Sequence, residues 1–369
     1  MPSQSANSIH VINQCLGLAK KNFKVILYIL SSKININESE IKKFYGIKSK
    51  KIKIKYFYNF IPFAKNLQIN FLFLFNIYSI NKNDLIISRN LYASFFLSKI
   101  LRYQSIYETH QVEKGIRGLL QKMILNSSLI KTIVISNILK EILSSHHKII
   151  LKNCYVLHDA APENIKSFNY QKKDFYIRKM LKINLNNYEF TCGYFGQINK
   201  GRGIEIIISL ANLLPNYCFL IFGGEKKEIE NLRKKNQLKN LKYMGYYKNH
   251  ESRKIMKCLD ALLMPYQNKV FVGKRGLDTS KWMSPMKMFE YLASGVPILS
   301  SNLPVLKEIL KDKVNCLLVN PSDPNDWKEN LELLKNNPGI GERISKNAFI
   351  QYKNNHTWKQ RANKILNLR

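Results

Sequence analysis

A lysine and a glutamate stand three residues apart in the stretch SPMKMFEYLASGVPILSS, Ser284–Ser301. Residues at this spacing lie on nearly one face of a helix, so Lys287 and Glu290 point the same way if the stretch is helical. A helix N-terminus favours a bound anion, and a carboxylate can accept hydrogen bonds from the vicinal hydroxyls of a ribose. The pair predicts a site for a phosphorylated sugar or nucleotide. An ion pair between the two side chains is the alternative.

The same stretch indicates where its helix begins. Ser284 is a favourable N-cap, and Pro285 suits the first helical position. A capping box would place Glu or Gln where Lys287 stands, and a cation in the first turn costs roughly a few tenths of a kcal/mol unless an anion lies in front of it. We therefore expect the turn from Ser284 through Met286 to Lys287 to bind a phosphate. A solvated surface lysine is the alternative.

A second candidate phosphate loop is GQINKGRG, Gly196–Gly203, between an expected strand and an expected helix. Its spacing is neither that of a dinucleotide-binding fingerprint nor that of a Walker A loop, so spacing alone does not identify it. Arg202 can bind a phosphate through two parallel hydrogen bonds. A plain β–α turn is the alternative.

These loops need strands and helices to position them, and short apolar strands alternate with helices along the chain. Such alternation predicts α/β domains with parallel, doubly wound sheets. We expect one Rossmann-like domain at 1–165, a second at 166–350, and a C-terminal helix at 351–369 that packs back toward the first domain. The first six residues are polar and a helix begins by about Ser8, so we expect a chain that begins late and a first domain that lacks its first strand. The expected strands are at 24–28, 52–57, 85–88, 105–107, 132–135, 153–157, 188–195, 218–224, 241–245, 261–266, 296–300 and 316–319.

Composition and charge bear on the partners that this protein can have. The formal net charge is +34, from 59 Lys and Arg against 25 Asp and Glu, but the chain is also rich in Ile and Asn, which share A/T-rich codons with Lys. Binding to nucleic acid would account for the charge but for no other feature of the sequence. We therefore favour an anionic membrane surface as the partner of the basic residues. Six cysteines and seven histidines are scattered, which predicts reduced thiols and no metal cluster. The most apolar stretch, Ile69–Tyr78, is about half a membrane span.

The segments GYFGQINKGRGIEIIISLANLLP, FLIFGG, KYMGYY, DALLMPY, DTSKWMSPMKMFEYLASGVPILSSNLPVLKEIL and NCLLVNPSDPNDW resemble the nucleotide-sugar-binding half of family 4 retaining glycosyltransferases. The segments PSQSANSIH, YETHQ, TIVISNILKEIL and VLHDAAPENI resemble the subset of that family with PS-x-x-ANS-x-H near its start and an SP-x-K-x-FEY block. The resemblance implies a GT-B fold, in which two Rossmann-like domains face a cleft.

The resemblance also assigns roles on the donor side. The last Glu of the family's E-x7-E signature falls on Glu290 and implies contact with the ribose, whereas the first Glu falls on Trp282 and is absent. The Arg/Lys pair that grips the donor phosphates falls on Gln197 and Arg202, so only its second cation is kept. We expect Lys287 to replace the missing one.

Further matches place the remaining site residues. His110 matches the histidine that faces the donor sugar, Asn7 and Ser8 match the acceptor-side loop, and Gly245 and Tyr247 match the backbone that meets the base. His110, Arg202 and Glu290 are thus the expected catalytic group.

The function implied is transfer of a hexosyl group, with retention, from a nucleoside diphosphate sugar to a glycan or lipid-linked acceptor in polysaccharide biosynthesis. We expect no metal, no cofactor and no nucleic-acid partner, and a place in the cytoplasm at the inner face of the cell membrane. The alternatives are a sugar-nucleotide epimerase of the same architecture and a basic nucleic-acid-binding protein.

Overall fold

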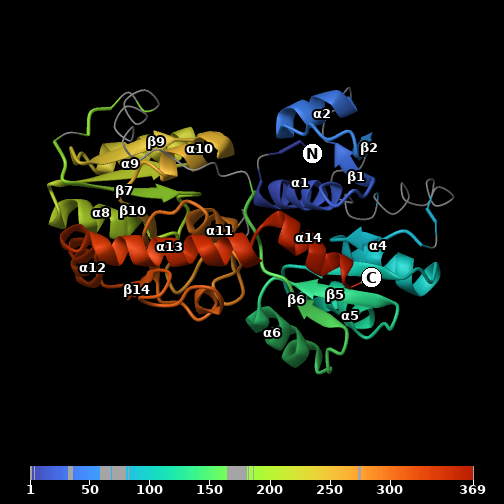
Figure 1. Cartoon of the computed structure of the whole chain (residues 1–369). Coiled ribbons are helices and arrows are strands. Elements are labelled where there is room, and N and C mark those ends of the chain that lie inside the picture. Colours follow the sequence, from blue (N-terminus) through green and yellow to red (C-terminus); the bar gives the residue numbers. More distant parts are fainter. Residues whose placement is uncertain are drawn as a thin grey trace. The chain divides into compact units, whose positions relative to one another are not determined.

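The computed structural model divides the chain into two compact units (Figure 1). Unit 1 comprises Met1–Ala160 and Thr357–Arg369, and unit 2 comprises Ala161–His356. The domain boundaries expected from sequence were 165/166 and 350/351, and helix α13 (Pro338–Asn355) runs across the second of these positions. The structure describes residues 2–3, 5–31, 36–58, 68, 80–81, 83–163, 181, 183–185, 187–272 and 276–368, and the apolar stretch 69–78 lies outside them.

Unit 2 is built on a six-stranded sheet with the order β14-β13-β10-β7-β8-β9, in which every strand pair is parallel. The chain order reverses between β7 and β10, so the expected doubly wound sheet is confirmed, and ligands of such sheets bind near this switch point. The strands are β7 (Phe190–Phe195), β8 (Tyr217–Phe222), β9 (Leu241–Gly245), β10 (Ala261–Met264), β13 (Ile298–Ser301) and β14 (Leu317–Val319).

Helices connect these strands. A two-stranded antiparallel ribbon, β11 (Phe271–Val272) with β12 (Leu277–Asp278), and a short 3₁₀ helix, η5 (Leu306–Glu308), complete the described part of the unit. The helices are α8 (Ile204–Leu213), α9 (Lys226–Lys235), α10 (Asn249–Met256), α11 (Met286–Leu292), α12 (Pro324–Asn336) and α13.

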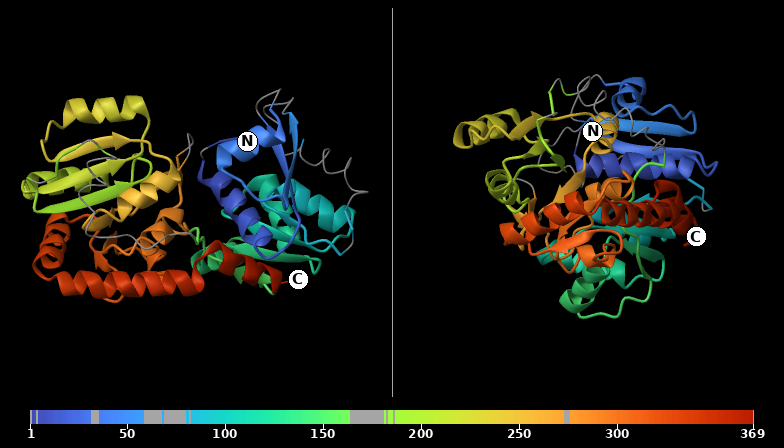
Figure 2. Two further views of the ribbon diagram at one scale, coloured as in Figure 1. Left: turned by 45° about the horizontal axis from the view of Figure 1, so that its top comes forward. Right: turned by 60° about the vertical axis from the view of Figure 1, so that its left-hand side comes forward.

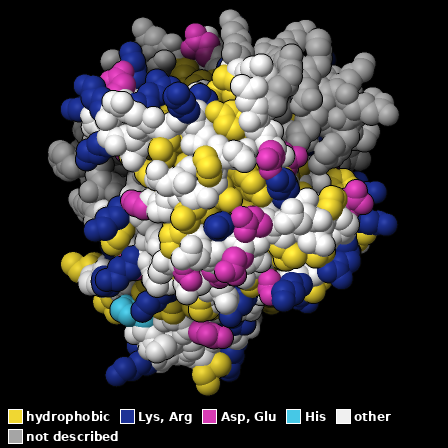
Figure 3. Space-filling view, turned by 90° about the vertical axis from the view of Figure 1, so that its left-hand side faces the viewer, with side chains coloured by type: hydrophobic (Ala, Val, Ile, Leu, Met, Phe, Trp, Pro, Cys, Tyr) yellow, Lys and Arg dark blue, Asp and Glu magenta, His cyan; other side chains and the backbone are white. Residues whose placement is uncertain are grey.

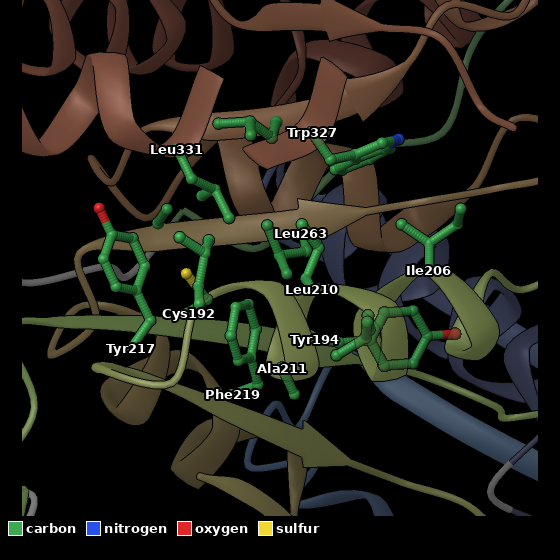
Figure 4. Packing of buried hydrophobic residues seen from close by; sticks show 14 of the residues in the cluster. Cys192, Tyr194, Ile206, Leu210, Ala211, Tyr217, Phe219, Leu263, Trp327 and Leu331 are labelled. Atoms are coloured by element: carbon green, nitrogen blue, oxygen red, sulfur yellow. The ribbon is translucent and has the colours of Figure 1, made fainter. Parts of the chain in front are cut away.

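The core of unit 2 lies between the central strands and the helices packed on them (Figure 4). Every residue of β7 and β8 is buried, as expected for parallel strands covered on both faces. Cys192 and Phe219 from these strands meet Leu210 of α8 and Leu331 of α12. Tyr194 belongs to the same buried cluster, so the end of β7 that leads into the glycine loop is held rigidly by the core.

Unit 1 contains two parallel sheets among its described residues. The first pairs β1 (Val25–Ser31) with β2 (Ile52–Tyr58), and the second has the order β3-β4-β5-β6. Of residues 1–6, the structure describes 2, 3, 5 and 6, and none of these is in a strand. The strands of the second sheet are β3 (Ile87–Ser88), β4 (Ser105–Thr109), β5 (Ile130–Val134) and β6 (Cys154–Val156).

The C-terminal helix α14 (Trp358–Leu366) packs against α1 (Ala6–Ala19) within unit 1 (Figures 1 and 2). Gly17 permits the contact, because a Cβ there would lie 2.5 Å from the carbonyl oxygen of Trp358. The last described residues therefore complete the unit that the first ones begin. The other helices are α2 (Glu38–Tyr45), α4 (Leu91–Phe95), the π-helix η3 (Phe96–Ile100), α5 (Gly115–Leu125) and α6 (Asn137–His147).

Charge is distributed unequally between the units. Unit 1 holds 27 Lys and Arg against 7 Asp and Glu, a formal charge of +20, and unit 2 holds the remaining +14. On the face drawn in Figure 3, acidic side chains lie among basic ones. None of the described helices is both long enough and apolar enough to cross a bilayer.

Candidate functional site

Helix α11 begins one residue later than predicted. Its N-cap is Pro285, in extended conformation, and not Ser284. The first turn closes on the Pro285 carbonyl, which accepts a hydrogen bond from the Met288 N–H (2.9 Å). Pro285 has no side-chain donor or acceptor, so no side chain caps the helix and Lys287 lies in its first turn.

The Lys287 amine is buried without a hydrogen-bond partner among the described residues. Its Nζ lies 3.9 Å from the ring centroid of Tyr194 and 4.4 Å from that of Tyr266. Burial, followed by the charge of Arg202, holds the pKa of Lys287 well below its ordinary value. A surface lysine and an ion pair with the neighbouring glutamate are both inconsistent with this environment.

Arg202, from the glycine loop, also contacts Tyr266. Its Nη1 donates to the Tyr266 hydroxyl (3.0 Å), and its guanidinium carbon lies 5.2 Å from the ring centroid. The Arg202 Nε is buried without a hydrogen-bond partner in the described part of the chain. Two cationic side chains with unsatisfied donors therefore meet around Tyr266, which is the arrangement expected of an anion site.

The backbone of the glycine loop, Gly196–Gly203, lies next to Lys287. Gly196 adopts φ +149°, and a Cβ built on it would lie 3.5 Å from the Lys287 Nζ. Its N–H donates to the Phe222 carbonyl (2.9 Å), and the carbonyl of exposed Gln197 accepts from the Tyr194 hydroxyl. The loop and the first turn of α11, predicted separately as phosphate sites, thus lie together.

Glu290 pairs with Arg253 of α10, at 3.4 Å between Oε1 and Nη1, and not with the lysine of its own helix. Burial raises the pKa of Glu290, and the charge of Arg253 opposes that shift. The carboxylate is partly exposed and retains further lone pairs for hydroxyl groups.

Gly245 is the last residue of β9, and Tyr247 follows two residues later. The Gly245 carbonyl accepts from the Gly223 N–H (2.7 Å), and the Tyr247 ring packs edge-on against Phe222 at 5.5 Å between centroids. Because carboxyl ends of parallel strands share one sheet edge, Gly196, Gly245 and the residues after β10 lie at the ligand-binding edge of unit 2.

In unit 1, His110 follows β4 directly. Its Nε2 lies 2.8 Å from Oε1 of Glu108, and burial, with a contribution from Arg89, lowers the pKa of His110 to about 4. Burial raises the pKa of Glu108, but the charges of Arg361 and His10 outweigh it and hold that pKa well below its usual value. A carboxylate only accepts, so the proton of neutral His110 is assigned to Nε2.

Glu108 is the centre of a buried charge network. Arg361 of α14 donates to both of its oxygens (3.2 and 3.5 Å), and the Nε2 of His10 lies 3.2 Å from Oε1 and 3.0 Å from Asp159 Oδ1. His10, Glu108 and His110 have metal-ligand chemistry within 4.8 Å of one another. They do not fit a metal ion, because a dication there would face the buried Arg361 guanidinium that already neutralises Glu108.

Ser8 and Asn7, predicted on the acceptor side, differ in environment. Ser8 is buried, and its hydroxyl hydrogen-bonds the hydroxyls of Ser3 (2.7 Å) and Ser5 (3.0 Å), the N-cap of α1. Asn7 is exposed on the first turn of α1. The serines of the N-terminal motif therefore order the start of α1, and the acceptor role stays a prediction.

Comparison with known proteins shows what unit 2 is similar to. Residues 177–351, just under half of the chain, match the family model described as glycosyl transferases group 1. An uncharacterised glycosyltransferase of Methanocaldococcus jannaschii is 25% identical over 47% of this chain and 45% of its own. The alpha-galactosylglucosyldiacylglycerol synthase of Streptococcus pneumoniae is 24% identical over 49% and 46%.

The chain spans about half the length of these curated relatives. A solved structure of HepE from Anabaena, which holds UDP and glucose, superposes with a TM-score of 0.72 at 14% identity, over 99% of this chain and 96% of that one. This likeness extends through both units and confirms the expected GT-B type of fold.

Within unit 2, the structure brings together Lys287, Arg202 and the glycine loop, and it gives Glu290 a partner that the sequence did not indicate, Arg253. In unit 1 it adds His10, Glu108 and Asp159 around His110. These three stand inside PSQSANSIH, YETHQ and VLHDAAPENI, so the motifs contained a signal for them. Arg361 stands in no such motif.

Proposed function

We propose that this protein transfers a glycosyl group from a nucleoside diphosphate sugar to an acceptor. The observation that carries the proposal is the pair of buried donors without acceptors among the described residues, Lys287 Nζ and Arg202 Nε, at the ligand-binding edge of a unit that matches the group 1 glycosyl transferases. Buried donors are almost always satisfied in folded proteins, so a pair of unsatisfied ones indicates a missing anion.

The diphosphate of the donor supplies that anion. Its oxygens accept hydrogen bonds from Arg202 and Lys287, and a bound dianion favours protonation of Lys287, whose pKa is otherwise held low. Two cations there stabilise the charge that develops on the leaving diphosphate. We therefore propose a reaction without a metal ion. Glu290 accepts hydrogen bonds from the ribose hydroxyls.

The finer proposals rest on the motif resemblance. We propose net retention and a hexosyl donor, with His110 facing the sugar. Trp282, in place of the first signature glutamate, removes one carboxylate from the sugar contacts. The ligands of HepE support a UDP-sugar as the first donor to test, and the name of the pneumococcal relative, a diacylglycerol glycolipid synthase, supports a lipid acceptor. From the motif resemblance we also propose a glycan acceptor as the alternative, and a place at the cytoplasmic face of the membrane.

The test measures the thermal shift of the whole chain with UDP, GDP and their sugars, followed by transfer to lipid-linked and glycan acceptors. Arg202→Met is expected to abolish the shift and transfer, whereas Lys281→Met, at an exposed lysine before α11, changes neither. A full nucleotide shift in Arg202→Met would refute the site. Sugar-nucleotide conversion without any acceptor would identify an epimerase instead.

A further inference from the structure

The amine of Lys287 lies against the faces of two tyrosine rings. Its Nζ is 3.9 Å from the ring centroid of Tyr194, near the end of β7, and 4.4 Å from that of Tyr266, which follows β10. Both tyrosines are buried, and a Cβ built on Gly196 would lie 3.5 Å from the same nitrogen. This nitrogen has no hydrogen-bond acceptor in the part of the chain that the structure describes. Ring faces and backbone therefore enclose the amine, in place of groups that solvate a charge.

The hydroxyl groups of the two tyrosines have other partners. The Tyr194 hydroxyl donates to the Gln197 carbonyl, and the Tyr266 hydroxyl accepts from the Nη1 of Arg202 at 3.0 Å. Burial raises the pKa of both hydroxyls, so neither tyrosine supplies a phenolate to pair with an ammonium. The amine meets the rings of these residues and not their oxygens.

The charged groups around the amine do not compensate a positive charge on it. Among the described acids, Glu290 on the same helix pairs with Arg253, and Glu205 in the first turn of α8 is exposed. The charge that acts on the Lys287 amine is the like charge of Arg202. Burial first, and Arg202 second, hold the pKa of Lys287 well below its ordinary value. A ring face attracts a cation, but it replaces only part of the hydration that burial removes.

We propose that Tyr194 and Tyr266 are positioning residues that keep the Lys287 amine uncharged in the free protein, so that a nucleoside diphosphate brings a proton onto it when it binds. The proton comes from solvent, forms a third N–H bond on Nζ, and returns to solvent when the diphosphate leaves. Phosphate oxygens supply the acceptors and the negative charge that the tyrosine rings do not, and both favour the ammonium. The inference rests on the proposed function, because the phosphates must lie at Lys287.

Proton uptake makes the affinity for the nucleotide depend on pH. The relevant range lies between the low pKa of the amine in the free protein and its higher pKa in the complex. Within that range, uptake of one proton per bound nucleotide lowers the affinity about tenfold for each unit by which the pH rises. Arg202 keeps its charge throughout, so its part of the binding does not change with pH.

The experiment is a calorimetric titration of the full chain with UDP and with GDP at about pH 8, in two buffers that differ in ionisation enthalpy. The phosphates themselves exchange almost no proton there, because their last pKa is about 6. The heat of binding then differs between the buffers in proportion to the protons taken up by the protein. We expect an uptake of about one proton per bound nucleotide.

Four variants assign the proton to its place. Lys287→Met is expected to remove the uptake and to flatten the pH dependence, and Lys287→Arg is expected to bind without uptake, because a guanidinium is always charged. Lys281→Met, at an exposed lysine, is the matched control and keeps both. Tyr266→Phe keeps the ring face and the uptake, whereas Tyr266→Ser admits water to the amine and lowers the uptake. The lysine variants decide the matter if Tyr266→Ser melts early.

Nucleotide binding with the same heat in both buffers would overturn the inference and leave the proposed function standing. Uptake that persists in Lys287→Met would also overturn it, because the proton would then go to another group. Unchanged uptake in a folded Tyr266→Ser would remove the tyrosine from the role given to it here. No binding of either nucleotide would overturn the proposed function together with the inference.

Discussion

Replacing Lys287 by methionine is expected to stabilise the protein while abolishing its activity. The lysine Nζ is buried with no hydrogen-bond partner in the described part of unit 2, and such a donor costs about 1–3 kcal/mol. Contact with the rings of Tyr194 and Tyr266 offsets part of that cost. Methionine fills the same volume without a donor.

The expected gain in the free energy of unfolding is about 1 kcal/mol, which corresponds to a rise in Tm of about 2–4 °C for a unit of this size. The expected loss in kcat is about 10²–10³-fold, as for removal of one preorganised donor from a developing anion. Calorimetry and a transfer assay measure the two quantities. Lys281→Met, at an exposed position, is the control and moves neither.

The pH dependence provides a second readout of the same lysine. Its pKa is lowered on folding by burial and by Arg202, so the unfolded chain binds the extra proton first as pH falls below 10.5. Stability of the wild type is therefore lost as pH falls from that value toward the lower folded pKa, and Lys287→Met removes this loss. If Lys287→Met is less stable than the wild type, or binds UDP as the wild type does, then the Lys287 amine already has a hydrogen-bond partner and is not part of an anion site.

Three further predictions concern the network of unit 1 and two glycines of unit 2. Arg361→Met leaves the buried Glu108 charge without its guanidinium partner, and is expected to cost about 3–5 kcal/mol in urea unfolding; the double variant with Glu108→Gln should recover much of that loss, and simple additivity would contradict the pairing. Because the pKa of His110 falls from 6.5 to about 4 on folding, the contribution of His110 to stability should decline as pH falls from 6.5 to 4 and level off below, and His110→Gln should flatten this part of the decline in calorimetric scans. Gly203→Ala should destabilise by more than about 1 kcal/mol, since φ is +77° and a Cβ would lie 1.8 Å from a carbonyl oxygen, whereas Gly339→Ala, in a helix with open space, should stabilise by up to about 1 kcal/mol.

Much of unit 2 was predictable from sequence because short, mostly apolar strands alternate with helices, which is the pattern of a covered parallel sheet. The expected strand at 241–245 coincides with β9, and the others differ by a few residues at their ends. The start of α11 was predicted one residue too early. Propensity favoured Ser284 as the N-cap, whereas the first turn closes on the carbonyl of Pro285.

Pairings between distant residues were not predictable. Nothing in the spacing of Lys287 and Glu290 reveals that the Lys287 amine is buried with no acceptor among the residues that the structure describes, or that Arg253, from another helix, pairs with Glu290. Arg361 and Glu108 are 253 residues apart, and their contact follows from the return of α14 to unit 1, which local patterns do not encode.

That return has a consequence for synthesis. Unit 2 is an insertion within unit 1, since the chain leaves unit 1 after Ala160 and re-enters it at Thr357. During translation, the later unit has all its residues before the earlier one does. Glu108 can pair with Arg361 only after unit 2 has been synthesised. Unit 1 is therefore the first unit to begin synthesis and the last to complete its fold. Residues 161–356 form the fragment to choose for expressing unit 2 alone.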